Sequence, residues 1–284
     1  MGMRDAQAVW QKDRFYVGGG YTSGSYRNDA RLYIYTPTTD MWGAMDTPVY
    51  WFALTTYHFQ LVLVGGREYV GEALGPVTNK LWTLDEQIKL QETLPPMTIR
   101  CFSATAVSHG DHLLVAGGND SDGTRLDVVE VYSKHIWFTA QPLPKPCTNM
   151  KSTVRDGHWY LMGGFKQGTA VYYASLDSLI ASCQPSETSQ TSSIWKRLPD
   201  IHSVRSTPSV FGKRLTTIGG SGESNLPISS IHAFSTHTQS WVHVGDLPVA
   251  GCSTCTIVLP SGELLVMGGF LNSTNKVFKA TLIG

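Results

Sequence analysis

Pairs of adjacent glycines recur along the chain at intervals of about 50 residues, each directly after a run of bulky apolar residues. The pairs are Gly18-Gly19, Gly65-Gly66, Gly117-Gly118, Gly163-Gly164, Gly219-Gly220 and Gly268-Gly269, so their first glycines are 47, 52, 46, 56 and 49 residues apart. Glycine is disfavoured within strands because it packs no side chain and loses the most backbone entropy on ordering. A regular series of such pairs therefore indicates a repeated structural unit.

Each unit contains four short segments with the composition of β-strands. Before each glycine pair come a short strand, a two-residue turn and an apolar run such as HWYLM at 158–162. The turns are predicted at 12–13, 58–59, 110–111, 156–157, 212–213 and 261–262. After the pair come a polar loop, a β-branched and aromatic stretch and a last segment, which in several units opens with Trp42, Trp137, Trp195 or Trp241. Helical periodicity is nearly absent, apart from a turn or two predicted at 175–183.

One such unit buries too little surface alone, whereas similar units packed face to face around an axis cover both faces of every sheet. A Cβ at the crowded strand ends would then collide with a neighbouring unit, which explains the glycines. The double glycine, followed by an aromatic residue and then Trp, resembles the kelch repeat, and residues 117–144 are the best copy. The resemblance covers nearly the whole chain and implies an all-β fold, a six-bladed kelch-type β-propeller with four-stranded antiparallel blades.

We expect one propeller domain, residues 1–284, with blades at about 5–48, 50–97, 101–146, 149–201, 206–248 and 252–284. Gln91 stands where blade 2 should have its Trp, and Trp82 on the preceding strand could compensate. An insertion at about 177–193 ends in a polar stretch, which we predict to be an exposed loop. The last blade ends after its third strand and residues 1–4 are too few to supply another, so we expect it to lack its outer strand here. This favours a domain taken from a longer protein.

Charge and cysteine content narrow the class of protein. The 22 basic residues balance the 22 acidic ones, and no apolar run approaches the roughly 20 residues of a spanning helix. We therefore expect no nucleic-acid partner, no membrane association and, without a visible secretory signal, a cytoplasmic location. Five cysteines form an odd, sparse set that favours reduced thiols over a disulfide framework. Glycosylation sequons at Asn119 and Asn272 leave a secreted protein as the alternative.

The sequence contains only weak matches to motifs for metal binding, cofactor binding or catalysis. Cys252 and Cys255 are three residues apart on a predicted strand, so their side chains should diverge, and no second pair completes a zinc site. His109 and His112 flank a turn, and the sequence NDSDG at 119–123 lacks the later Glu of a calcium loop. The glycine-rich stretch 18–24 fails the dinucleotide fingerprint. We predict no catalytic residue, no metal site and no cofactor, and therefore no enzyme.

The loops remain as candidates for function, because the strands are committed to packing. One set of loops follows the glycine pairs and another joins successive blades, and both should emerge on one face. Arg, Tyr and Trp, the types that dominate binding hot spots, recur in these loops, and the joining set also contains Tyr50 and Lys151. The predicted partner-binding residues are Tyr21, Arg27, Trp51, Arg67, Tyr69, Arg100, Phe102, Asn119, Arg125, Asn149, Phe165, Lys166, Arg205, Asn225 and Phe270.

These features predict a monomeric propeller that binds a protein or peptide of unknown identity through one face, as part of a larger multidomain protein. The resemblance implies domains that present partners to ubiquitin ligases or bind cytoskeletal proteins. A substrate-recognition domain of a ubiquitin ligase adaptor is therefore one alternative. A carbohydrate-binding or metal-dependent enzymatic propeller is another, since an exposed Trp51 and neighbouring tyrosines would stack on sugars.

Overall fold

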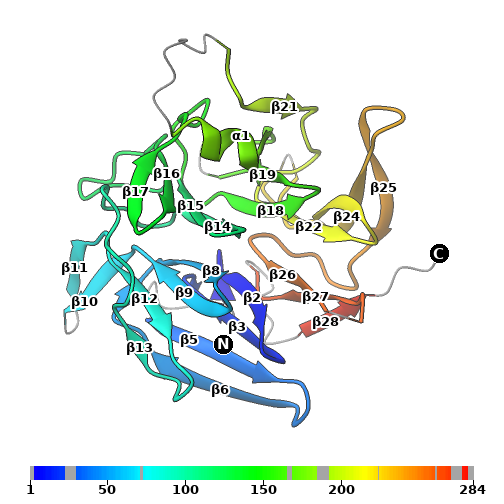
Figure 1. Ribbon diagram of the computed structural model, residues 1–284. Coiled ribbons are helices and arrows are strands. Elements are labelled where there is room, and N and C mark those ends of the chain that lie inside the picture. The colour runs from blue at the N-terminus through cyan, green and yellow to red at the C-terminus, as the bar shows by residue number, and fades with distance from the viewer. Residues whose placement is uncertain are drawn as a thin grey trace.

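Antiparallel sheets surround a common axis in the computed structural model of the protein (Figure 1). The structure describes residues 3–22, 30–70, 73–164, 168–183, 192–222, 224–259, 261–269 and 277–280. Six of the sheets are blades, each of which follows the chain strand by strand from the axis outward. The six-bladed, essentially all-β propeller predicted from the repeat is confirmed.

The first three blades have four strands each. Blade 1 consists of β2 (Gln7–Gln11), β3 (Arg14–Gly18), β5 (Arg31–Thr36) and β6 (Met41–Asp46). Blade 2 consists of β8 (Ala53–Tyr57), β9 (Gln60–Val64), β12 (Leu81–Leu84) and β13 (Leu90–Gln91). Blade 3 consists of β14 (Thr105–His109), β15 (His112–Ala116), β16 (Val129–Ser133) and β17 (Ile136–Thr139).

The last blade differs from the others by one strand. Blade 4 consists of β18 (Lys151–Arg155), β19 (His158–Met162), β20 (Val171–Ser175) and β21 (Lys196–Leu198), with α1 (Leu176–Ala181) after its third strand. Blade 5 consists of β22 (Thr207–Phe211), β23 (Arg214–Ile218), β24 (Ser230–Ser235) and β25 (Ser240–Asp246). Blade 6 consists of β26 (Cys255–Val258), β27 (Leu264–Met267) and β28 (Val277–Ala280), so within the described residues its outer strand is lacking, as predicted.

Two small sheets accompany the blades. β1 (Met3–Arg4) pairs with β4 (Tyr21–Thr22), and β7 (Val49–Tyr50) pairs with the hairpin of β10 (Arg67–Val70) and β11 (Ala73–Val77). The N-terminal residues thus form part of a separate two-stranded sheet.

The hydrophobic core is divided into six clusters, each of which joins two consecutive blades. The largest one packs Leu114 of blade 3 against Trp159 and Leu161 of blade 4. The last one packs Ala6 and Val17 of blade 1 against Cys255 and Met267 of blade 6, which closes the ring. Because neighbouring blades cover both faces of the strands that precede the glycine pairs, strands such as β9 and β15 are buried on both faces and their apolar residues do not alternate with polar ones.

The glycine pairs lie where one blade approaches the next. A Cβ on Gly117, whose φ is +64°, would lie 2.5 Å from the carbonyl oxygen of Cys147. In blade 1 the equivalent pair is Gly19-Gly20, so the predicted pair Gly18-Gly19 is wrong by one residue. Three consecutive glycines made the register ambiguous, and Gly18 is the last residue of β3.

The hairpin turns follow the prediction in blades 1 to 5, where two residues join the inner strands. In blade 6 the predicted residues 261–262 also lie in the turn, but the turn is longer than two residues because pairing of β26 and β27 ends at Val258 and Leu264. In blade 2 Trp82 is buried in the cluster shared with blade 1, and β13 is short where Gln91 replaces the Trp.

The insertion in blade 4 begins with the predicted helical turn. α1 buries Leu176 and Leu179, and Ser175 caps it by accepting a hydrogen bond from the backbone N–H of Ser178. The helical turn predicted within residues 175–183 is therefore confirmed. Most of the polar stretch that follows lies outside the described residues.

Candidate functional site

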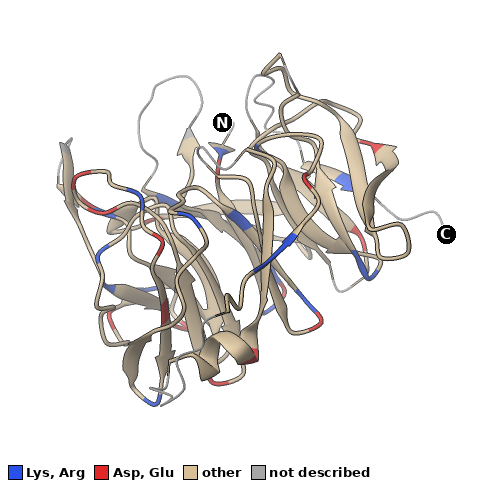
Figure 2. Cartoon of the chain, turned by 90° about the horizontal axis from the view of Figure 1, so that it is seen from above, with Lys and Arg blue, Asp and Glu red and all other residues tan. Residues whose placement is uncertain are grey.

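The glycine pairs and the connections between blades lie at one end of the inner strands, which we call the loop face. Thr105, the first residue of its inner strand, pairs with Ala116, the residue just before a glycine pair, so both features meet at the same end. Figure 2 shows the ring edge-on, with the N-terminal segment on this face and α1 at the opposite one. Lys and Arg are interspersed with Asp and Glu around the ring (Figure 2).

A ring of residues in the left-handed backbone region surrounds the axis on the loop face. Each connection contributes one such residue, two positions before an inner strand: Asp5, Trp51, Ser103, Asn149, Arg205 and Ser253, with φ between 55° and 58°. We call these six residues the axial ring. Within the described chain, the backbone N–H of a ring residue donates a hydrogen bond to the carbonyl oxygen of the preceding ring residue. The donor–acceptor pairs are Ser103–Trp51, Asn149–Ser103, Ser253–Arg205 and Asp5–Ser253, at 2.8–3.0 Å. This conformation costs a non-glycine residue about 1–2 kcal/mol, so the axial ring stores backbone strain around the propeller axis.

Five of the predicted residues belong to one cluster of arginines and aromatic rings on the loop face. The ring centroids of Tyr21 and Trp51 lie 5.2 Å apart, and those of Trp51 and Phe102 also 5.2 Å apart. The guanidinium carbon of Arg67 lies 5.4 Å from the centroid of Phe102, and that of Arg4 lies 5.4 Å from the centroid of Tyr21. Both arginines are therefore in cation–π range.

Tyr50 connects this cluster to the β10–β11 hairpin. Its ring lies 6.5 Å from Trp51 and meets Tyr69 edge-on at 5.5 Å. Tyr69 is 53% exposed, and Val70 and Leu74 on the same hairpin are also exposed. We call Arg4, Tyr21, Tyr50, Trp51, Arg67, Tyr69 and Phe102 the arginine–aromatic cluster.

Trp51 is only 8% exposed, which corrects the expectation of an exposed indole that stacks on sugars. Its ring packs against both Tyr21 and Phe102. Its indole nitrogen is buried and has no hydrogen-bond partner. Trp51 therefore organises the cluster from within rather than offering a surface.

The loop of blade 3 adjoins the arginine–aromatic cluster. Asn119 forms backbone bridges with Phe102 and Arg125, and its amide nitrogen donates to the hydroxyl of Thr148 at 2.7 Å. Arg67 donates to the carbonyl oxygen of Ser121 in the same loop at 3.4 Å. Asn119 and Arg125 are thus adjacent to the cluster.

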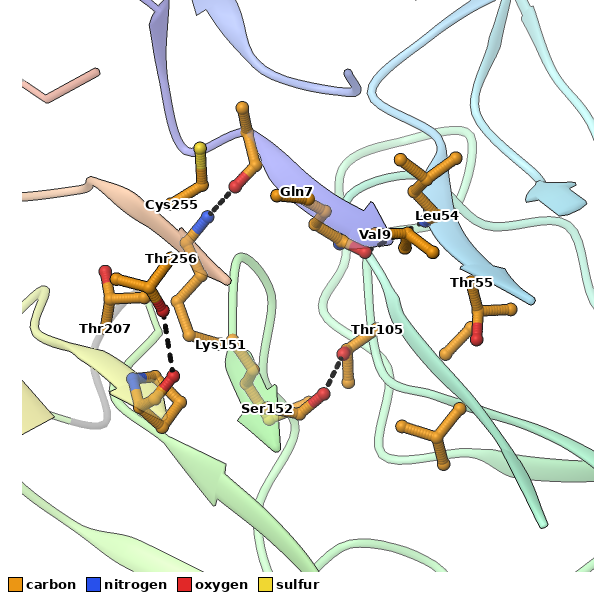
Figure 3. A pocket seen from close by; sticks show the side chains of 16 residues that line it. Gln7, Val9, Leu54, Thr55, Thr105, Lys151, Ser152, Thr207, Cys255 and Thr256 are labelled. Carbon is orange, nitrogen blue, oxygen red and sulfur yellow. Dashed lines mark hydrogen bonds between the residues drawn. The ribbon is translucent and has the colours of Figure 1, made fainter. Parts of the chain in front are cut away.

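Three other predicted residues line a cavity of about 550 Å³ on the axis, which we call the mouth cavity. They are Asn149, Arg205 and Asn225, and Tyr21 of the arginine–aromatic cluster lines the same cavity. Below it a narrower channel of about 180 Å³ runs between the inner strands of all six blades (Figure 3). Lys151 lines both spaces.

The sequence analysis missed Arg4 and Asp5, which also line the mouth cavity. Both sit in the segment that leads into the first inner strand, where the repeat places Tyr50 and Trp51 in blade 2. Extending the alignment backwards from Gln7 would have found them.

The remaining predicted residues are not brought into these groups. Arg100 is exposed in the connection between β13 and β14. Arg27, Phe165, Lys166 and Phe270 lie outside the described residues.

Burial shifts the pKa of several groups. It lowers the pKa of Lys151, an effect that Asp5 and Cys255 oppose. Burial, with a smaller contribution from Asp5, raises the pKa of Tyr21. It also raises the pKa of the Cys101 and Cys147 thiols to about 12 and that of Cys255 to about 11, so these thiols stay protonated and weakly nucleophilic.

The sulfur and histidine motifs show no convergent site. Cys252 and Cys255 are both buried, and neither forms a disulfide. Within the described ranges, no group of three or more His, Cys, Asp or Glu side chains is placed to hold a metal ion. Among the same residues, no helix has the length and apolar content that crossing a membrane requires.

Comparisons with known proteins agree with the fold. A family model described as Kelch motif matches residues 100–144. "Kelch repeat and BTB domain-containing protein 1" of cowpox virus (strain Brighton Red) is 24% identical over 234 residues, which are 80% of this chain and 39% of the viral protein. "Kelch domain-containing protein 8B" of Homo sapiens is 23% identical over 149 residues, 51% of this chain and 41% of the human protein. The chain thus spans about two fifths of these relatives.

A solved structure is similar over the whole ring. The protein described as "Structure of YjhT" superposes with a TM-score of 0.74 at 14% identity, covering 99% of this chain and 98% of that one. At this identity the likeness concerns the fold.

Proposed function

Since this chain is a kelch-repeat β-propeller, we propose that it acts as a protein-interaction module whose loop face binds a protein or peptide. The observation that carries the proposal is the arginine–aromatic cluster, which combines the side-chain types found at binding hot spots. Its rings hold one another in fixed positions, so little conformational entropy would be lost on binding.

We propose that the partner segment carries acidic residues. Arg67 and Arg125 flank the blade 3 loop, and the exposed Tyr69 supplies apolar area beside them. Arg67, whose guanidinium lies over the Phe102 ring, and Arg125 carry the planar N–H groups that bind carboxylates in bidentate fashion.

A panel of acidic, neutral and basic peptides that contain aromatic residues tests this proposal by fluorescence anisotropy. The variant Arg67→Glu/Arg125→Glu should lose acidic-peptide binding by about tenfold or more, because attraction becomes repulsion at two positions. The matched control Lys134→Glu/Lys213→Glu changes the same charge in exposed turns at the opposite face and should bind as the wild type does.

If thermal melting shows that both proteins are folded and the Arg67→Glu/Arg125→Glu variant binds acidic peptides as tightly as the wild type, the proposal of an acidic partner is rejected. Binding that follows neither charge nor aromatic content would remove the loop face as the interaction surface.

We further propose that the ring is one part of a longer cytoplasmic protein. Its relatives are more than twice as long as the matched segment, and one is named for a BTB domain beside its kelch repeats. None of the five cysteines forms a disulfide in the described structure, which supports a reducing compartment. Recognition of a substrate for a ubiquitin ligase is a second candidate. Reconstituted ubiquitin transfer to a bound partner by the full-length protein tests it, and absence of transfer would reject it.

A further inference from the structure

Six structurally equivalent positions lie at the start of the inner strands, two residues after the axial ring. Each is the first residue of an inner strand and pairs with the residue directly before the blade's glycine pair. They are Gln7, Ala53, Thr105, Lys151, Thr207 and Cys255. Five carry neutral side chains, so packing around the axis does not require a charge. The lysine in blade 4 is the exception that needs an explanation.

The Lys151 side chain reaches across the axis and forms the floor of the mouth cavity. Its ammonium donates to the carbonyl oxygen of Ala6 in blade 1 at 2.6 Å (Figure 3). An ammonium carries three N–H donors, and this is the hydrogen bond that the structure records for it within the described residues. Its burial disfavours the charged form, as the lowered pKa shows. A buried ammonium is costly unless an anion balances it.

The walls of the mouth cavity add to this positive charge. Arg4 and Arg205 line it together with Lys151, and Asp5 is the carboxylate among the described lining residues. The side-chain amides of Asn149 and Asn225 supply further donors on the same lining. Cations therefore outnumber carboxylates, within a concave space large enough for a small ligand or a side chain.

We propose that the mouth cavity is a binding site for a carboxylate, which Lys151 contacts from the floor and Arg205 from the wall. A planar carboxylate matches a guanidinium edge and an ammonium within one cavity. The carboxylate belongs either to a free small acid or to an acidic side chain of a peptide. The inference does not rest on the proposed function, because a small acid would fill the cavity with nothing else on the loop face.

Isothermal titration calorimetry with succinate and with acetyl-Gly-Glu-Gly-amide tests the site, with succinamide and acetyl-Gly-Gln-Gly-amide as neutral counterparts. We expect saturable one-to-one binding of at least one acid in the millimolar range or tighter, and none of its neutral counterpart. Succinate binding alone identifies a free acid as the ligand, and peptide binding identifies an acidic side chain.

Variants separate a binding role of Lys151 from a structural one. Lys151→Met should weaken binding at least tenfold, since the ligand loses a charge-assisted hydrogen bond to a buried ammonium. Arg205→Gln, an exposed rim position that folding does not need, should weaken it about threefold or more. The control Lys213→Met, in an exposed turn at the opposite face, should leave it unchanged.

Several results would overturn the inference: no binding of either acid to the wild type, equal binding of inorganic phosphate, or binding that Lys151→Met and Arg205→Gln leave unchanged. If Lys151 only tied blade 4 to blade 1, the Lys151→Met variant would have a lower melting temperature and unchanged ligand binding. The variant Arg67→Glu/Arg125→Glu should bind the acid as the wild type does. Failure of the proposed loop-face function therefore remains distinguishable from failure of this site.

Discussion

Gly117 shows how the absence of a side chain sets the distance between two blades. A Cβ there would meet the carbonyl oxygen of Cys147 at 2.5 Å and the methyl group of Met150 at 2.8 Å. Gly110, in the hairpin turn of the same blade, has a similar positive φ of 55° but nothing within 4 Å of such a Cβ. A comparison of substitutions at the two glycines therefore distinguishes the cost of a positive φ from the cost of a clash with the neighbouring blade.

We expect Gly110→Ala to lower the free energy of unfolding by about 1 kcal/mol, the cost of the left-handed conformation alone. Gly117→Ala should lower it by about 3 kcal/mol or more, because the neighbouring blade's backbone must also move. Urea denaturation of the two variants measures the difference. Similar losses in both would mean that the glycine pairs serve conformation and not blade spacing.

The axial ring marks the limit of sequence reasoning at this scale. The glycine pairs could be recognised in the sequence, since adjacent glycines recur directly after apolar runs. Trp51, Ser103 and Arg205 are not residue types that favour the left-handed region, so no local pattern predicted their conformation. It is imposed by the ring of hydrogen bonds between connections, which exists only after the blades have assembled.

Among the elements, the outer strands are tied to the preceding blade by tryptophan. The indole nitrogen of Trp137 donates to the carbonyl oxygen of Pro95, and that of Trp241 to the carbonyl oxygen of Pro199, both at 2.9 Å. The repeat predicted the tryptophans and the proline-bearing stretches. It did not predict that one binds the other, because the contact joins residues of adjacent units. Trp42, in blade 1 next to the three-stranded blade 6, is 46% exposed.

We expect Trp241→Phe to lower the free energy of unfolding by about 2 kcal/mol, because a hydrogen bond and buried area are lost together. Trp42→Phe should cost less, under about 1 kcal/mol, since that indole is nearly half exposed. Thermal and urea unfolding of the pair of variants provide the comparison. A larger loss for Trp42 would show that blade 1 depends on a contact outside the described residues.

The ring as a whole is held by clusters between blades, and these clusters are unequal. The one between blades 3 and 4 contains fourteen buried residues, whereas the one between blades 6 and 1 contains Ala6, Val17, Cys255 and Met267 within the described chain. The sequence predicted that consecutive units would pack together. It did not rank the interfaces, because the burial of each depends on side chains from two distant segments.

We expect the interface between blades 6 and 1 to open first. Amide hydrogens in β26 and β27 should exchange faster than those in β14 and β15, because local opening there breaks the smallest cluster. Hydrogen–deuterium exchange with mass spectrometry resolves these strands as separate peptides. Equal protection all around the ring would indicate that it opens only as a unit.

In the described part of the chain, blade 6 ends at β28, whose outer edge faces no further strand. Such an edge offers its backbone donors and acceptors as a template to any extended segment. A fourth strand, from elsewhere in the same polypeptide or from a separate molecule, would complete the sheet while the loop face and the channel kept their shape. The edge of blade 6 is thus the place where another segment of the polypeptide or a second molecule can bind by strand addition, without any change in the rest of the surface.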